Sequence, residues 1–235
     1  DGWRMRKSGI PHMMPPVTQL EALVGRLGIG NDTHVIVYGS GTGPFDAAET
    51  TSIYLTLKYL GHDMVSILDG GLPAWMDEWS ADFDVGTHEP TAAQFLSNAR
   101  PELLISRSDV ETSLTDGTAM IDVRSHDMFM GVNRAWMLTR SGTIPNALNL
   151  PMSWLTENAG LKFRNPEQLE RLFTAVGAPT KGKVILFCNA GLESSMGWFA
   201  AHELLGMDDA VLYDGSLAEW TKDDTLPLTK HVEFE

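Results

Sequence analysis

The residue best suited to chemistry in this sequence is Cys188, the only cysteine among its 235 residues. It follows the apolar run Val184–Phe187 and precedes a short loop made of Asn189, Ala190, Gly191, Leu192, Glu193 and Ser194. A helix-like stretch, residues 195–205, comes next. This order predicts that the sulfur lies at the C-terminal end of a strand, facing backbone N–H groups and the start of a helix. Such surroundings favour a thiolate, which is a nucleophile.

Two other interpretations of Cys188 are an apolar core residue and the nucleophile of a phosphatase. Free cysteines are often small apolar core residues, and a lone cysteine can be only that. A cysteine-dependent phosphatase would need an arginine at the position of Ser194 to clamp a phosphate, so the sequence argues against that class. Glu193 brings a negative charge into the loop, which opposes thiolate formation and repels an anionic donor.

The composition excludes several other classes of function. The chain is 43% hydrophobic and 20% charged, with a net charge of −14, which fits a globular protein and disfavours binding to nucleic acid or anionic membranes. One cysteine excludes an internal disulfide framework and a multi-cysteine metal site. No apolar run is long enough to span a membrane, and residues 1–7 do not start a signal peptide. We expect a soluble protein of the cytoplasm or periplasm; the first residue is not Met, so the compartment stays open.

An internal repeat indicates how the chain is organised around Cys188. Residues 60–75 align with residues 205–220 without a gap, and seven of the sixteen pairs are identical. Each copy reads as a helix, an apolar strand, a loop, a second helix and a further strand. Helices that alternate with short apolar strands predict an α/β fold with a parallel sheet flanked by helices. In such sheets ligands bind beyond the C-terminal strand ends, where Cys188 is expected.

The two copies differ in length and at the site. The first copy has the glycine-rich segment Tyr38–Phe45 in place of the cysteine loop, and this segment lacks the features of a phosphate-binding loop. Strands expected at Ala119–Ser125 and Ala147–Pro151 have no counterpart in the first copy. We therefore predict a partial, inactive N-terminal domain (1–80), a linker (81–92) and a C-terminal catalytic domain (93–235).

Several segments together resemble the tandem-domain rhodanese family of sulfurtransferases. They are Ile121–Ser125, Ser141–Ala147 and Tyr213–Trp220 in the second half, with Pro11–Pro15 and Leu68–Gly71 in the first. The resemblance implies two rhodanese-like α/β domains, of which the first is inert and N-terminally incomplete. It also implies that Cys188 takes a sulfane sulfur from a small donor, thiosulfate or 3-mercaptopyruvate, as a persulfide. A thiol or cyanide then accepts the sulfur, and no metal or organic cofactor is needed.

The departures from the family pattern concern charge. Thiosulfate-type members carry cations directly after the cysteine, whereas Asn189 and Ala190 stand there in this chain. Arg134 and Arg140 are the candidate substrate-binding residues that could compensate, and solvated loop arginines are the alternative. Arg124 is expected to form a structural ion pair, and Asp122, at a strand end, is likewise expected to be structural.

Two further functions stay open from the sequence. One is a persulfide relay that exchanges sulfur with a protein donor or acceptor and needs little binding of small anions. The other is a degenerate rhodanese module that binds partners without chemistry.

Overall fold

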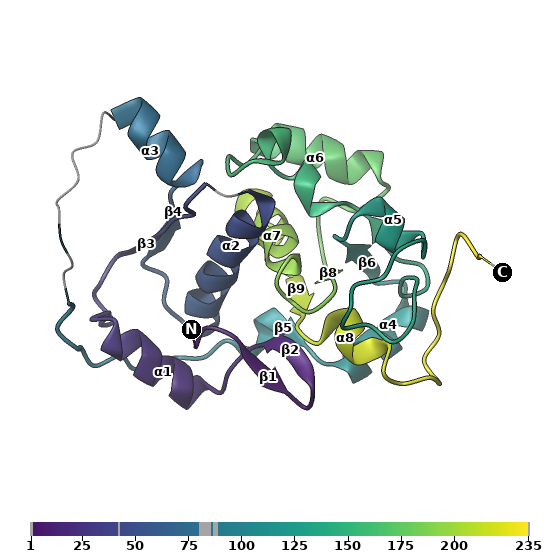
Figure 1. Ribbon diagram of the computed structural model, residues 1–235, viewed down its shortest axis with the longest axis horizontal. Coiled ribbons are helices and arrows are strands. Elements are labelled where there is room, and N and C mark those ends of the chain that lie inside the picture. Colours follow the sequence, from purple (N-terminus) through teal and green to yellow (C-terminus); the bar gives the residue numbers. More distant parts are fainter. Residues whose placement is uncertain (1, 42, 80–85, 87–88, 235) are drawn as a thin grey trace.

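A five-stranded parallel sheet forms the centre of the second half of the chain (Figure 1). The computed structural model describes residues 2–41, 43–79, 86 and 89–234. The strands follow the spatial order β5-β9-β8-β6-β7. Their bounds are β5 (Leu104–Ile105), β6 (Ala119–Asp122), β7 (Leu148–Asn149), β8 (Val184–Phe187) and β9 (Ala210–Tyr213).

Helices cover both faces of this sheet. They are α4 (Arg107–Asp116), α5 (His126–Phe129), α6 (Pro166–Ala175), α7 (Ser194–Trp198) and α8 (Ser216–Trp220). A π-helical turn, Phe199–Leu204, continues α7, and 3-10 turns occupy Pro101–Leu103, Met152–Trp154 and Glu157–Ala159. Reciprocal capping boxes, Ser106 with Asp109 and Asn165 with Gln168, begin α4 and α6.

The central strand β8 shows why the sheet is buried on both sides. All four of its residues are buried. Val184 and Leu186 belong to one apolar cluster, whereas Ile185 and Phe187 belong to another. Because successive side chains of a strand point to opposite faces, each face of β8 packs into its own core.

The first half of the chain carries a smaller version of the same arrangement. It contains the antiparallel hairpin β1 (Met5–Lys7) and β2 (Ile10–Met13), the parallel pair β3 (Val35–Val37) and β4 (Val65–Ile67), and the helices α1 (Val17–Arg26), α2 (Pro44–Tyr59) and α3 (Gly71–Trp79). The sequence repeat is confirmed in the register of the strands. Val35 pairs with Val65 in the first copy, and the corresponding residues Val184 and Ala210 pair in the second.

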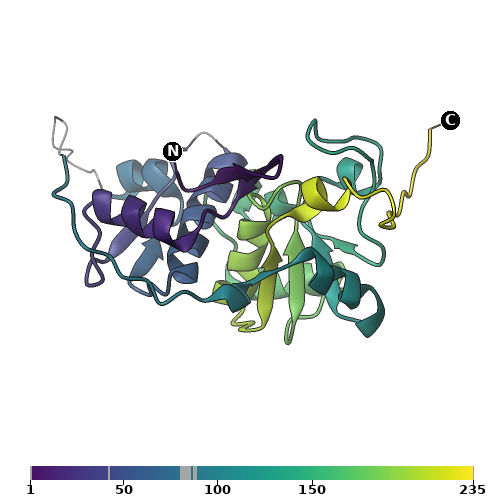
Figure 2. The same cartoon turned by 90° about the horizontal axis from the view of Figure 1, so that it is seen from below.

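The two halves pack side by side through polar and apolar contacts (Figures 1 and 2). Helix α2 lies against α7, where the hydroxyls of Thr51 and Ser195 form a buried hydrogen bond of 2.8 Å. Strand β2 contacts α8 on another side. The backbone N–H of Met14, just after β2, donates to the Asp214 carboxylate at 2.8 Å. These contacts bring the first half close to the C-terminal ends of β8 and β9.

Most of the expected architecture is confirmed. The fold class is α/β, and the first half has only two parallel strands among the described residues. The β1–β2 hairpin was not expected. The predicted linker 81–92 lies largely outside the described residues, and Ala93 and Asn98 donate backbone hydrogen bonds to Gly25 and Leu60 of the first half. The domain limits stay a prediction. No helix in the described part of the chain has the length and apolar character to cross a membrane.

Candidate active site

Cys188 lies where the sequence placed it, directly after strand β8. The strand ends at Phe187, and α7 begins at Ser194, so the intervening loop connects the strand end to the helix. The Cys188 side chain is fully buried, and the chain contains no second thiol. Any thiol chemistry of this protein therefore takes place at this loop.

The first residue of α8 holds the cysteine loop in place. The Ser216 hydroxyl accepts hydrogen bonds from the backbone N–H groups of Cys188, at 3.1 Å, and Gly191, at 3.2 Å. It donates to the Tyr213 carbonyl at 2.8 Å, and its oxygen lies 4.0 Å from the Cys188 sulfur. Sequence reasoning did not single out Ser216, although it stands in the repeated Asp-Gly turn that follows β9. Ser216 is thus a positioning residue of the loop.

Gly191 is required at its position for steric reasons. Its φ of 76° lies in the left-handed region. A Cβ atom there would come within 2.6 Å of the Asp214 carbonyl oxygen. The loop can therefore approach the end of β9 only with glycine at this point.

The electrostatics of the thiol differ from the expectation. The pKa of Cys188 is raised from 9.0 to about 11, first because the thiol is buried and second because of the Glu193 charge. The hydroxyl and N–H of Ser194 and the N–H of Ala190 act in the opposite direction. The expectation that these surroundings favour the thiolate is therefore wrong for the resting thiol, because its pKa is raised. The Ser194 hydroxyl is buried and lies near the Cys188 sulfur. It has no other hydrogen-bond partner in the described part of the chain.

Glu193 is held beside the sulfur by its own loop. Its carboxylate accepts a hydrogen bond of 3.0 Å from the Asn189 amide. Burial raises the Glu193 pKa, whereas the Asn189 hydrogen bond and the charge of Arg124 lower it. The direction of the effect of Glu193 on the thiol agrees with the expectation from sequence.

The structural ion pair expected of Arg124 is confirmed, and its partner is Asp122. Both side chains are almost completely buried, and their closest nitrogen–oxygen distance is 2.6 Å. The Thr143 hydroxyl donates to Asp122 at 2.7 Å, and Arg124 also donates to the Gly142 carbonyl at 2.8 Å. The pair joins the end of β6 to the turn at 142–143.

The two candidate substrate-binding arginines make contacts away from the cysteine loop. Arg134 is exposed and donates to the Thr139 carbonyl at 2.6 Å. Arg140 directs its guanidinium to main-chain carbonyls, among them those of Asp223 at 2.6 Å and Leu226 at 2.9 Å. Their role in substrate binding stays a prediction, and the contacts of Arg140 weigh against it.

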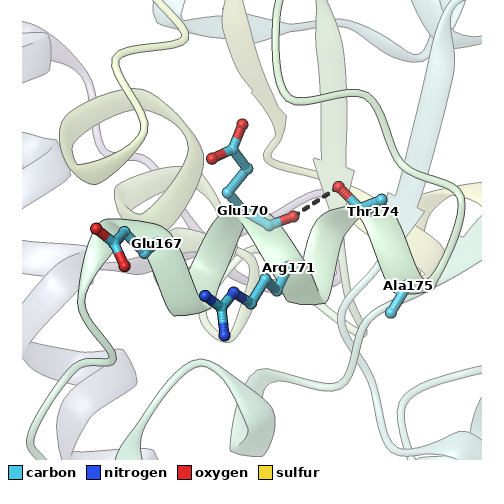
Figure 3. Close-up of a pocket in the computed structure, with 5 residues that line it drawn as sticks. All are labelled: Glu167, Glu170, Arg171, Thr174 and Ala175. Atoms are coloured by element: carbon cyan, nitrogen blue, oxygen red, sulfur yellow. Dashed lines mark hydrogen bonds between the residues drawn. The ribbon is translucent and has the colours of Figure 1, made fainter.

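One hollow has no residue of the cysteine loop in its lining. It has a volume of about 660 Å³ and is lined by one face of α6: Glu167, Glu170, Arg171, Thr174 and Ala175 (Figure 3). None of these residues contributes a hydrogen bond to the cysteine loop. Among the described residues, no group of three or more His, Cys, Asp or Glu side chains is arranged to hold a metal ion.

Comparison with known proteins connects this arrangement to a family. The model of the rhodanese-like domain matches residues 9–78 and 106–223, which is most of the chain. The chain belongs to the rhodanese-like family. Both halves match, although only the second carries a thiol at the strand end.

The relatives of this rhodanese-like protein bear the names of sulfurtransferases. A protein of Haloferax volcanii, named "Putative thiosulfate sulfurtransferase", is 34% identical over 85% of this chain and 70% of its own length. The human 3-mercaptopyruvate sulfurtransferase is 28% identical over 92% of this chain and 71% of its own length. The crystal structure of SseA from Escherichia coli, described as a 3-mercaptopyruvate sulfotransferase, superimposes with a TM-score of 0.77 at 27% identity. It covers 91% of this chain and 78% of SseA. These likenesses support sulfurtransferase activity as the enzyme class of this chain.

Proposed function

We propose that this protein transfers a sulfane sulfur from a small donor to a thiophilic acceptor through a persulfide on Cys188. The observation that carries the proposal is the position of the only thiol. It stands at the end of the central strand, on a loop whose backbone is held by Ser216. The first half of the chain, which has no thiol, supplies no nucleophile in this scheme.

In the first half-reaction the Cys188 thiolate attacks the outer sulfur of the donor. A sulfur–sulfur bond forms at Cys188 while the donor's bond to that sulfur breaks. With thiosulfate the leaving group is sulfite. With 3-mercaptopyruvate it is the enolate of pyruvate, which takes up a proton. The electron pair of the broken bond departs with the leaving group, so no external oxidant is required.

In the second half-reaction a thiophile attacks the outer sulfur of the persulfide. Cyanide yields thiocyanate and a thiol yields a persulfide, and in both cases the Cys188 thiolate departs as the leaving group. The N–H groups of Ala190 and Ser194, which lower the pKa of the thiol, favour this anion in both half-reactions. Because the resting thiol is mainly protonated at neutral pH, loss of its proton must accompany donor binding or attack.

The charge in the loop bears on which donor is used. Glu193 raises the pKa of the thiol and repels an incoming anion, and thiosulfate carries more negative charge than 3-mercaptopyruvate. We therefore expect 3-mercaptopyruvate to be the better of the two donors. The same charge favours a persulfide relay fed by a protein donor as the second candidate function.

Steady-state sulfur transfer tests the proposal. Wild-type protein and Cys188→Ser are incubated with either donor and with cyanide, and thiocyanate is measured. We expect turnover by the wild type and none by Cys188→Ser. Turnover that survives in Cys188→Ser would refute the mechanism. Transfer from a protein persulfide only would favour the relay, and transfer from no donor would favour a non-catalytic binding module.

A further inference from the structure

A second cavity, of about 370 Å³, borders the cysteine loop from the side of the first half. Its lining combines the N-terminal hairpin, α2 and a single loop residue, and consists of Gly2, Trp3, Arg4, His12, Glu49, Ser52, Ile53 and Leu192. Leu192 directly precedes Glu193 in the loop that carries Cys188. The cavity is therefore shared between the thiol-free half and the loop where sulfur transfer is proposed.

The hairpin that forms one wall is anchored to the same strand end as the loop. The Met14 N–H donates to the Asp214 carboxylate, and Asp214 in turn lies against Gly191. Lys222 donates to the Ser8 carbonyl at 3.1 Å and ties the hairpin turn to the second half. These contacts hold the wall of the cavity in a constant position relative to the cysteine loop.

This wall is basic within a strongly acidic protein. Residues 2–13 include Arg4, Arg6 and Lys7 and contain no acidic residue, whereas the chain as a whole has a net charge of −14. Of these three cations, Arg4 is the one that lines the cavity. Arg4 and Arg6 both act on His12 and lower its pKa, after the larger effect of burial. Glu49, on the opposite wall, acts against them.

Arg4 is held in position with one donor unused. Its guanidinium donates to the Thr56 hydroxyl at 2.8 Å and to the Ser52 carbonyl at 3.1 Å. Its Nε atom is buried and has no acceptor among the described residues. A buried donor without an acceptor is costly, and an anionic oxygen that reached it would relieve that cost. Burial lowers the pKa of Arg4, and the Asp214 charge acts against this effect.

We propose that this cavity binds the anionic end group, a carboxylate or a sulfonate, of the sulfur donor. The first half would then supply the cation that the cysteine loop lacks, through Arg4 and with His12 at the rim. The link to a sulfur donor rests on the proposed function, whereas anion binding by the cavity does not. The sequence pointed to Arg134 and Arg140 for this role, but their guanidinium groups face main-chain carbonyls elsewhere.

Binding to full-length Cys188→Ser tests the proposal without turnover. Pyruvate and 3-mercaptopyruvate are the carboxylate probes, thiosulfate is the sulfonate-like probe, and dissociation constants are measured by titration calorimetry at low salt. His12→Asp is the main variant in this background, because His12 is exposed and Asp tolerates its φ of 58°. His12→Asn is the matched neutral control, and Arg4→Met removes the fixed cation.

We expect His12→Asp to weaken binding about three- to tenfold, as for one added charge several ångströms from the ligand. Arg4→Met should weaken it at least about tenfold, as for loss of a charge-assisted hydrogen bond, and His12→Asn should change it less than about twofold. In wild-type enzyme the same His12→Asp change should raise KM and leave kcat nearly constant.

Several outcomes separate the possibilities. Binding of pyruvate and 3-mercaptopyruvate alone would identify a carboxylate site, and binding of thiosulfate alone would identify a sulfonate site. Absence of binding by all three probes would overturn the proposal, as would dissociation constants unchanged by both His12→Asp and Arg4→Met. Anion binding by Cys188→Ser combined with no sulfur transfer by the wild type would leave the cavity assignment intact and refute only the proposed function.

Discussion

Replacing Glu193 by Gln tests the electrostatic account of the cysteine loop. The substitution removes the charge beside the sulfur and keeps an oxygen that can accept the hydrogen bond from Asn189. The loop geometry should therefore survive, and the change in the thiol should report the charge alone. We expect the pKa of Cys188 to fall.

The size of the effect follows from the contributions to the thiol pKa. The pKa is raised from 9.0 to about 11, and burial contributes more than Glu193 does. We expect Glu193→Gln to lower it by about one, which corresponds to about 1.4 kcal/mol. At pH 8 the thiolate fraction then rises about tenfold. Because a less basic thiolate is a weaker nucleophile, the net gain in alkylation rate at pH 8 is about threefold.

Alkylation by iodoacetamide measures this directly, since Cys188 is the only thiol in the chain. The rate is followed against pH, and its midpoint gives the pKa. Glu170→Gln, at an exposed position of α6, is the matched control and should leave the midpoint unchanged. A midpoint that is the same in Glu193→Gln and wild type would refute the role assigned to Glu193, and a higher midpoint would reverse its sign.

Three further predictions concern stability and the loop. Gly191→Ala should lower the thermal midpoint by several degrees and reduce sulfur transfer at least about tenfold. The reason is that the added Cβ would lie 2.6 Å from the Asp214 carbonyl oxygen. A fully active, equally stable variant would contradict this. Asp122→Ala should lower the free energy of unfolding in urea by roughly 3–5 kcal/mol, because it leaves the Arg124 charge buried and unpaired. The control Asp209→Ala, at an exposed position, should lower it by less than about 0.5 kcal/mol. The raised pKa of Cys188 means that the folded state prefers the neutral thiol, so its contribution is complete below pH 9.0 and is lost as the pH rises to about 11. The unfolding free energy of wild type should therefore fall by up to about 3 kcal/mol more than that of Cys188→Ser over this range, and parallel pH profiles would refute this.

The sequence predicted the elements around the thiol well because their signals are local. The apolar run Val184–Phe187 is the strand β8 itself, and the repeat located the corresponding pair β3 and β4. Patterns of this kind depend on neighbours along the chain, which the sequence displays.

The site itself was less predictable because its contacts join distant segments. The hydroxyl of Ser216 reaches Cys188 across 28 positions of sequence, and Met14 binds Asp214 across 200. The raised pKa of the thiol depends chiefly on burial, which no local pattern reveals. For the same reason Arg4 was overlooked, since its proximity to the loop arises only when the two halves pack together.

The most direct test of the central claim is the intact mass of the protein after incubation with 3-mercaptopyruvate and, separately, with thiosulfate. We predict a gain of one sulfur atom per chain that disappears on adding a thiol and never appears in Cys188→Ser. An unchanged mass with both donors, in folded protein whose Cys188 still alkylates, would contradict transfer from a small donor through a Cys188 persulfide.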